Sequence, residues 1–148
     1  MYASIDIGNT FAKIGFFEGN QFLNFQKGLS IEELVSVVKE RNIERIILSS
    51  VTKSQAELQE IFSEIAIEKV FLNPETPLPI IKNYETPQTL GADRLAAAVG
   101  ANFLFPNRNV LIIDMGTAIK YDYVSEIGAF EGGIISLGMR IRFEALHT

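Results

Sequence analysis

The stretch Asp6-Ile7-Gly8-Asn9-Thr10 recurs at position 114 as Asp114-Met115-Gly116-Thr117-Ala118. Each copy stands where an apolar, strand-like segment ends in a turn and the chain reverses into a second strand. In both places a further turn and a third strand follow. An internal repeat of this kind sets the architecture of a protein. It predicts two related α/β halves with matching Asp-x-Gly hairpins that face each other across a cleft.

Outward from the first copy, strand-like and helix-like segments alternate. We expect strands and helices in the order β-β-β-α-β-α-β, at 2–8, 11–18, 21–27, 31–41, 45–50, 52–65 and 68–72. Ser30 followed by Glu33 predicts a capping box at the first helix. The apolar run 46–48 is typical of a buried parallel strand. This order predicts an α/β fold with helices over a mixed sheet that begins with an antiparallel three-stranded meander.

Residues 73–91 break this rhythm with four of the five prolines. An ordered connection of this length is either functional or disordered. The segments expected after it are a helix at 92–105, a strand at 109–114, a strand to 124, a third strand to about 136 and a helix that starts near Gly138. We therefore expect a first domain at 1–107 and the start of a second, incomplete domain at 108–148.

Composition excludes several classes of protein. With 47% hydrophobic and 21% charged residues, the 148-residue chain is not intrinsically disordered. Its net charge of −5 argues against nucleic-acid binding, which needs a basic face. The absence of cysteine and the single histidine, His147, argue against thiolate and Ser–His catalysis. There is no apolar run of the ~20 residues that a membrane span needs, and no signal peptide is recognisable, so we expect a cytoplasmic protein without a membrane partner.

Both hairpins carry residue types that suit nucleotide binding. A tight glycine turn exposes backbone N–H groups that bind phosphate oxygens, and threonine adds a hydroxyl donor. The aspartates repel a polyphosphate, so we expect them to hold a cation, directly or through water. The residues concerned are Gly8 and Gly116, Thr10 and Thr117, and Asp6 and Asp114.

Three further features each allow two interpretations. Lys13 is either a surface lysine on a strand or a point charge on a β- or γ-phosphate. Asp93 either caps the alanine-rich helix or orients a substrate hydroxyl, as a base weakened by the helix dipole. The pair Gly132-Gly133 marks either a bulge or the close approach of a ligand or another backbone.

Taken together, these motifs resemble the type III pantothenate kinase family, whose members have also been called Bvg accessory factors. The matching motifs are Asp6–Thr10 with Lys13, Leu90–Arg94, Asp114–Ala118 and Gly132–Ile135. The family lies in the actin-like ATPase and sugar kinase superfamily of duplicated RNase H-like domains. The resemblance implies ATP-dependent phosphorylation of pantothenate to 4′-phosphopantothenate, the first step of coenzyme A biosynthesis. It also implies Mg²⁺, K⁺ or NH₄⁺ as cations, and a homodimer.

The resemblance also implies roles for individual residues. Asp93 would accept the proton of the pantothenate hydroxyl, and Asp114 would hold the monovalent cation. ATP would be bound by Asp6, Ile7, Gly8, Asn9, Thr10, Phe11, Ala12, Lys13 and Thr117, and pantothenate by Tyr84, Gly91, Ala92, Asp93 and Arg94.

The sequence departs from the family pattern in two places, and family members are longer. Lys120 stands where the family usually has threonine, and Leu137-Gly138 stands where it has Pro-Gly. An alternative hypothesis is therefore a non-catalytic, kinase-like regulatory or accessory protein, or an inactive fragment. A third is a kinase of the same superfamily that acts on a sugar or another acid.

Overall fold

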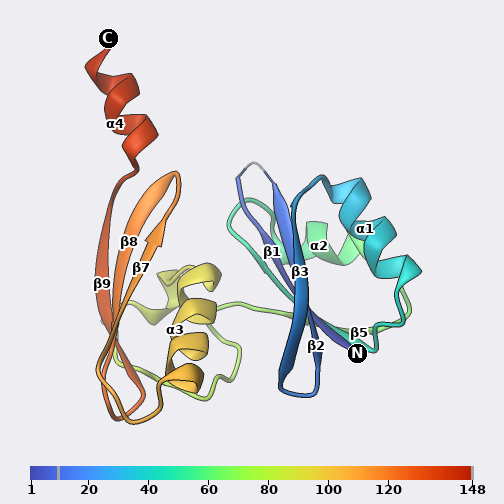
Figure 1. The fold of residues 1–148 in the computed structure, drawn as a ribbon, viewed down its shortest axis with the longest axis horizontal. Coiled ribbons are helices and arrows are strands. Elements are labelled where there is room, and N and C mark those ends of the chain that lie inside the picture. The colour runs from blue at the N-terminus through green and yellow to red at the C-terminus, as the bar shows by residue number, and fades with distance from the viewer. Residues whose placement is uncertain (10, 148) are drawn as a thin grey trace. The chain divides into compact units, whose positions relative to one another are not determined.

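A computed structural model describes residues 1–9 and 11–147, without the side chain of Pro87. The chain divides into two compact units. The first comprises Met1–Thr76 with Gly91–Asp93, and the second comprises Pro77–Leu90 with Arg94–Thr148. Each unit is built on one sheet (Figure 1).

The first unit holds a five-stranded mixed sheet with two helices. Its strands, in the spatial order β3-β2-β1-β4-β5, are β1 (Tyr2–Ile7), β2 (Ala12–Glu18), β3 (Gln21–Leu29), β4 (Arg45–Ser50) and β5 (Glu68–Phe71). Strands β1, β2 and β3 are antiparallel neighbours, whereas β4 runs parallel to both β1 and β5. This arrangement confirms the expected α/β class, the mixed sheet and the opening meander.

Alternation along the strands builds the core of the first unit. Ala3, Ile5 and Ile7 point to one face of β1 and are buried, because successive side chains of a strand point to opposite faces. The continuous apolar run of β4 buries Ile46 and Leu48. Helix α1 (Ile31–Glu40) adds its buried face to this core.

The two helices of the first unit begin at capping boxes. Ser30 and Glu33 form the expected box at the start of α1. Helix α2 (Gln55–Ile61) begins at an equivalent box of Ser54 and Glu57, so the helix expected at 52–65 is shorter at both ends. The Ser50 hydroxyl accepts the backbone N–H groups of residues 52 and 53, which commits that segment to a turn.

The second unit holds a four-stranded sheet. Its strands, in the order β6-β9-β8-β7, are β6 (Ile81–Lys82), β7 (Val110–Met115), β8 (Ala118–Val124) and β9 (Ala129–Leu137). The antiparallel β7-β8-β9 meander matches β1-β2-β3, as expected. Strand β6, parallel to β9, and a 3₁₀ turn at Pro87–Thr89 lie in the proline-rich segment, which is ordered but has no periodicity that predicts a strand.

Helix α3 (Ala92–Leu104) covers one face of the second sheet. Its Leu95 and Ala98 pack with Leu90, Val124 and Phe130 in one buried cluster. The expected domain boundary between residues 107 and 108 was inferred from the internal repeat, whereas the two compact units are defined by which segments pack together. The boundary between repeated domains therefore stays a prediction.

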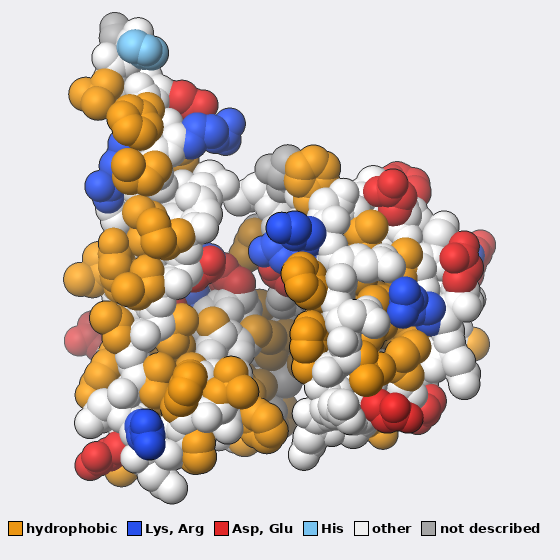
Figure 2. Space-filling model, viewed as in Figure 1, with side chains coloured by type: hydrophobic (Ala, Val, Ile, Leu, Met, Phe, Trp, Pro, Cys, Tyr) orange, Lys and Arg blue, Asp and Glu red, His pale blue; other side chains and the backbone are white. Residues whose placement is uncertain are grey.

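The opposite face of this sheet is apolar and exposed. Ile113, Tyr121 and Ile134 lie in one cross-strand row, and Leu111 and Tyr123 form the next. Figure 2 shows further hydrophobic side chains gathered over β9 and the last helix, α4 (Met139–Leu146). Within the described part of the chain, no helix is long and apolar enough to cross a membrane.

Candidate functional site

The first predicted hairpin forms between β1 and β2. Asp6 lies directly opposite Lys13, and the Lys13 ammonium is 3.4 Å from the Asp6 carboxylate. The Ser49 hydroxyl, on β4, donates a hydrogen bond of 3.1 Å to the other carboxylate oxygen. The Gly8 N–H closes the turn on the carbonyl of Phe11. Asp6 is thus held at the strand end, with its side chain 40% exposed.

The remaining predicted residues of this hairpin differ in exposure. Ile7 and Ala12 are buried and anchor the turn in the core. Asn9 and Phe11 are exposed, so they are accessible to a ligand. Thr10 lies outside the described residues.

The second predicted hairpin forms between β7 and β8 in the same way. Asp114 lies opposite Lys120, and the two charged groups are 2.7 Å apart. The Gly116 N–H closes the turn on the carbonyl of Ala118 at 2.9 Å, and Thr117 is exposed at its tip. A strand-end aspartate, a glycine turn and an opposed lysine therefore occur in both units.

Gly138 supports the second turn. A Cβ at this position would lie 2.3 Å from the carbonyl oxygen of Gly116 and 2.4 Å from that of Thr117. Its N–H donates to the Thr117 carbonyl at 2.9 Å. Only a residue without a side chain allows this approach, which explains the glycine of Leu137-Gly138 in physical terms.

Asp93 lies in the first turn of α3 and is half-buried. A Cβ at Gly91 would lie 2.6 Å from the Asp93 Oδ1, so the carboxylate folds back over the backbone of Gly91. Because Gly91 has no side chain, nothing at this position blocks that orientation of the Asp93 carboxylate.

Arg94 is buried and forms an ion pair that the sequence did not reveal. Its Nε donates a hydrogen bond of 2.9 Å to Asp122 on β8, and its Nη2 donates to the same oxygen. Asp122 is only 2% exposed. The guanidinium carbon lies 5.8 Å from the centre of the Tyr84 ring and 5.5 Å from that of Phe130. Tyr84 and Arg94, both predicted to contact substrate, are therefore brought together.

The electrostatics of this cluster favour the charged guanidinium. Burial acts to lower the pKa of Arg94. The hydrogen bond and the charge of Asp122, with a further contribution from Tyr84, outweigh burial and raise this pKa above its ordinary value. Arg94 is therefore a permanent cation in the core of the second unit.

The glycine pair of β9 makes room for the same cluster. A Cβ at Gly133 would lie 2.4 Å from the Asp122 carboxylate, and one at Gly132 would lie 3.3 Å from the Tyr84 ring. Gly132 also has a φ of 115°, which favours glycine. Both interpretations of Gly132-Gly133 are found: the pairing of β8 with β9 has a register shift between Tyr123, opposite Gly132, and Val124, opposite Phe130, and other protein groups approach both glycines closely.

The two strand-end aspartates differ in how closely a lysine approaches them. Mg²⁺ in nucleotide sites is held by one or two carboxylates together with substrate phosphates; Asp6 offers Oδ1, the oxygen that accepts from Ser49, for this role, since the Lys13 ammonium is 3.4 Å from Oδ2. The Asp114 carboxylate already has the ammonium of Lys120 at 2.7 Å. It does not fit a metal cation at the same oxygen, because two positive charges at one carboxylate oxygen repel each other.

Two cavities border these elements. One of about 190 Å³ lies at the carboxyl ends of β4 and β5 in the first unit, where Ser50, Lys53, Asn73 and Ala92 are among its lining residues. Ala92 directly precedes Asp93. This cavity is thus next in sequence to the predicted proton acceptor.

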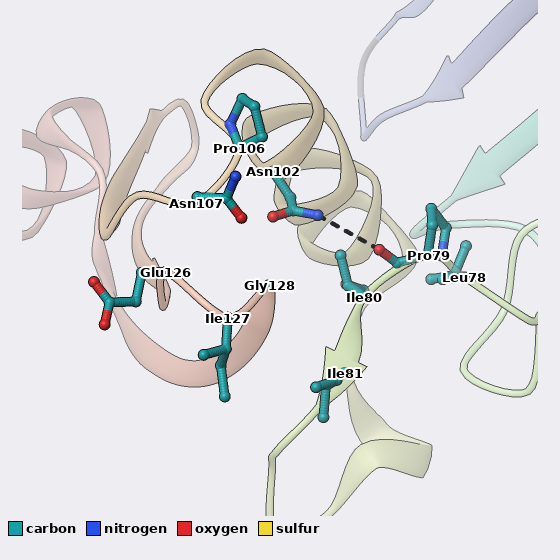
Figure 3. A pocket seen from close by; sticks show the side chains of 10 residues that line it. All are labelled: Leu78, Pro79, Ile80, Ile81, Asn102, Pro106, Asn107, Glu126, Ile127 and Gly128. Carbon is teal, nitrogen blue, oxygen red and sulfur yellow. Dashed lines mark hydrogen bonds between the residues drawn. The ribbon is translucent and has the colours of Figure 1, made fainter.

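The second cavity, of about 440 Å³, lies in the second unit and contains no predicted site residue. Asn102 of α3 points toward Pro79 and donates a hydrogen bond of 3.5 Å to its carbonyl, whereas the carboxylate of Glu126 points away (Figure 3). Glu126 is the one ionisable residue among its described lining residues.

Two solved structures are similar in fold to this chain. A Baf-family protein from Campylobacter jejuni matches with a TM-score of 0.58 at 23% identity, over 99% of this chain and 60% of its own. A Ppx/GppA family member from Aquifex aeolicus matches with a TM-score of 0.59 at 17% identity, over 97% and 53%. This chain therefore shares its fold with these two proteins.

The sequence comparisons identify the family of this chain. The profile of the type III pantothenate kinases matches residues 3–148. The type III pantothenate kinase of Phocaeicola vulgatus is 40% identical over 145 residues, which are 97% of this chain and 60% of that protein. The chain belongs to the type III pantothenate kinase family. It spans about 60% of the length of the curated relatives that it matches.

Proposed function

We propose that this chain takes part in the ATP-dependent phosphorylation of the primary hydroxyl of pantothenate to 4′-phosphopantothenate, the first step of coenzyme A biosynthesis. The observation that carries the proposal is the pair of matching hairpins, each with an aspartate opposite a lysine and a glycine N–H that closes the turn. Phosphoryl transfer depends mainly on positioning and on neutralising phosphate charge. Membership of the kinase family supports the same reaction.

In this proposal the first hairpin, Asp6–Lys13, cradles the phosphates of ATP, and Thr117 contacts the nucleotide from the second. The lysine at the end of the hairpin supplies a positive charge for the phosphates. Asp6 holds the divalent cation together with the phosphates. When bound, the divalent cation neutralises charge on the transferred phosphoryl group.

Asp93 is the proposed proton acceptor. The pantothenate hydroxyl oxygen forms a bond to the γ-phosphorus of ATP, the bond from that phosphorus to the bridging oxygen of ADP breaks, and the hydroxyl proton passes to the Asp93 carboxylate. A carboxylate suffices for this role, because the loose transition state of phosphoryl transfer needs little proton abstraction.

The proposed pantothenate contacts are Tyr84 and the segment Gly91–Arg94. The cavity that Ala92 lines supports the part of this assignment that concerns Gly91–Asp93, because Ser50, Lys53 and Asn73, which carry a hydroxyl, an ammonium and an amide group, are among its other lining residues. These groups suit a substrate that carries hydroxyl, amide and carboxylate functions. Such complementary polar groups fix the orientation of a ligand in a pocket.

We also propose that the protein forms a homodimer and acts in the cytoplasm. The exposed apolar row of Ile113, Tyr121 and Ile134 supports association, because large exposed apolar patches mark interaction surfaces.

The test is the conversion of pantothenate by the chain with ATP and Mg²⁺, measured as ADP release and as 4′-phosphopantothenate by mass spectrometry. Asp93→Asn should lower turnover by at least roughly 100-fold, since it removes the proton acceptor, and should leave ATP affinity unchanged. Glu40→Gln, a carboxylate-to-amide change at an exposed position at the end of α1, is the matched control.

Full turnover by Asp93→Asn would contradict the role of this residue. ATP binding by the unsubstituted chain without turnover would instead support the non-catalytic, kinase-like regulator.

A further inference from the structure

The ammonium of Lys120 is placed at Asp114 by the register of the sheet. The two residues are direct cross-strand partners in the β7-β8 pair, so their side chains share one face of the sheet. The distance from Nζ to Oδ2 is 2.7 Å, and the lysine side chain is only 20% exposed while that of the aspartate is 56% exposed. The lysine head therefore sits on the carboxylate instead of extending into solvent.

This ammonium has the properties that a monovalent cation would bring. It carries a single positive charge in a compact group and donates up to three hydrogen bonds to oxygen atoms. Because Lys120 is tethered on the neighbouring strand, its ammonium reaches the carboxylate at a high effective concentration. A dissolved cation would have to displace it from the same oxygen.

The same arrangement occurs in the first unit. Asp6 and Lys13 are also direct cross-strand partners, with a distance of 3.4 Å between the charged groups. Both hairpins therefore have the same charge pattern, with a lysine beside the strand-end aspartate.

We propose that the Lys120 ammonium takes the place of a monovalent metal cation beside Asp114, so that nucleotide binding by this chain needs no added K⁺ or NH₄⁺. The proposal rests on the ATP-dependent kinase function proposed above. It predicts that the monovalent-cation site returns when Lys120 is replaced by the threonine of the family pattern.

The first experiment needs no nucleotide. Tl⁺, a spectroscopic substitute for K⁺, is titrated with the 148-residue chain and followed by ²⁰⁵Tl NMR, with folding checked by circular dichroism. The unsubstituted chain should show no saturable binding, whereas Lys120→Thr and Lys120→Met should bind Tl⁺, and Asp114→Asn added to either should abolish it. Lys39→Thr, which breaks the exposed ion pair of Lys39 with Glu64, is the matched control and should behave as the unsubstituted chain.

The second experiment measures affinity for a fluorescent ATP analogue with Mg²⁺, in K⁺ and in tetramethylammonium at equal ionic strength. The affinity of the unsubstituted chain should be the same in both salts. That of Lys120→Thr should be roughly tenfold higher in K⁺, within the usual range of coupling between two bound ligands.

Saturable Tl⁺ binding to the unsubstituted chain that Asp114→Asn removes would overturn the proposal, and so would the absence of Tl⁺ binding to both Lys120 variants. If the unsubstituted chain binds no ATP, the proposed function fails, while the Tl⁺ titration still decides the role of Lys120.

Discussion

Replacement of Asp122 by valine is expected to destabilise the protein strongly. Arg94 would keep its charge, because the guanidinium remains protonated in proteins, and it would remain buried without the Asp122 carboxylate. Removing one member of a buried ion pair costs roughly 3–5 kcal/mol. Such a loss is a large share of the roughly 5–15 kcal/mol that stabilises a typical domain.

The valine suits a β-strand and is close to aspartate in volume, so the change acts mainly through charge. The measurement is urea unfolding followed by circular dichroism at 222 nm. In a thermal scan the same loss corresponds to a decrease of about 2–4 °C for each kcal/mol. Glu144→Gln, which breaks the exposed Arg140–Glu144 pair of α4, is the control and should change stability by less than about 1 kcal/mol.

The double variant Asp122→Val with Arg94→Met decides the reason for the loss. Replacing a whole buried ion pair by apolar residues of similar volume is often neutral or stabilising. The double variant should therefore recover most of the stability that Asp122→Val loses. If it is as unstable as Asp122→Val alone, or if Asp122→Val is as stable as the unsubstituted chain, an unpaired buried charge is not the cause and the reasoning is refuted.

Two further predictions concern glycine and helix caps. Gly133→Ala should destabilise by roughly 2–3 kcal/mol, because the added Cβ would lie 2.0 Å from the Tyr121 carbonyl oxygen; Gly100→Ala in α3, where a Cβ meets nothing within 4 Å, should stabilise by about 1 kcal/mol in the same urea assay. Ser54→Ala should cost about 1 kcal/mol at neutral pH. The backbone N–H and then the hydroxyl of Ser54 lower the pKa of Glu57, so the hydrogen bond from the hydroxyl to this carboxylate, which Ser54→Ala removes, stabilises above the ordinary carboxyl pKa and is lost as the pH falls through the lowered value. Equal acid sensitivity of Ser54→Ala and the unsubstituted chain would contradict it.

Local patterns in the sequence predicted most of the fold. The Asp-x-Gly turns, the strands that flank them and the capping box at Ser30 depend on residues a few positions apart, and each is found where expected. The ends of α2 were missed, because Ser50 and the second capping box at Ser54 compete locally with a longer helix.

The site was predicted less completely. The strand-end aspartates, the helix-start carboxylate and the glycine pair are visible in the sequence. The buried role of Asp122 was missed. Its one signal in the sequence is its place between two tyrosines in a mostly apolar strand. Its partner Arg94 is 28 positions away, a distance over which periodicity carries no information.

The sequence by itself determined the α/β class, the two meanders and the positions of the acidic turns, because turn chemistry and side-chain alternation are local properties of the chain. Tertiary structure alone decided that α3 packs on the second sheet, that Arg94 is buried on Asp122 and that Lys120 lies on Asp114. These outcomes depend on which surfaces bury apolar area together and on strand register, and both arise only when distant segments meet.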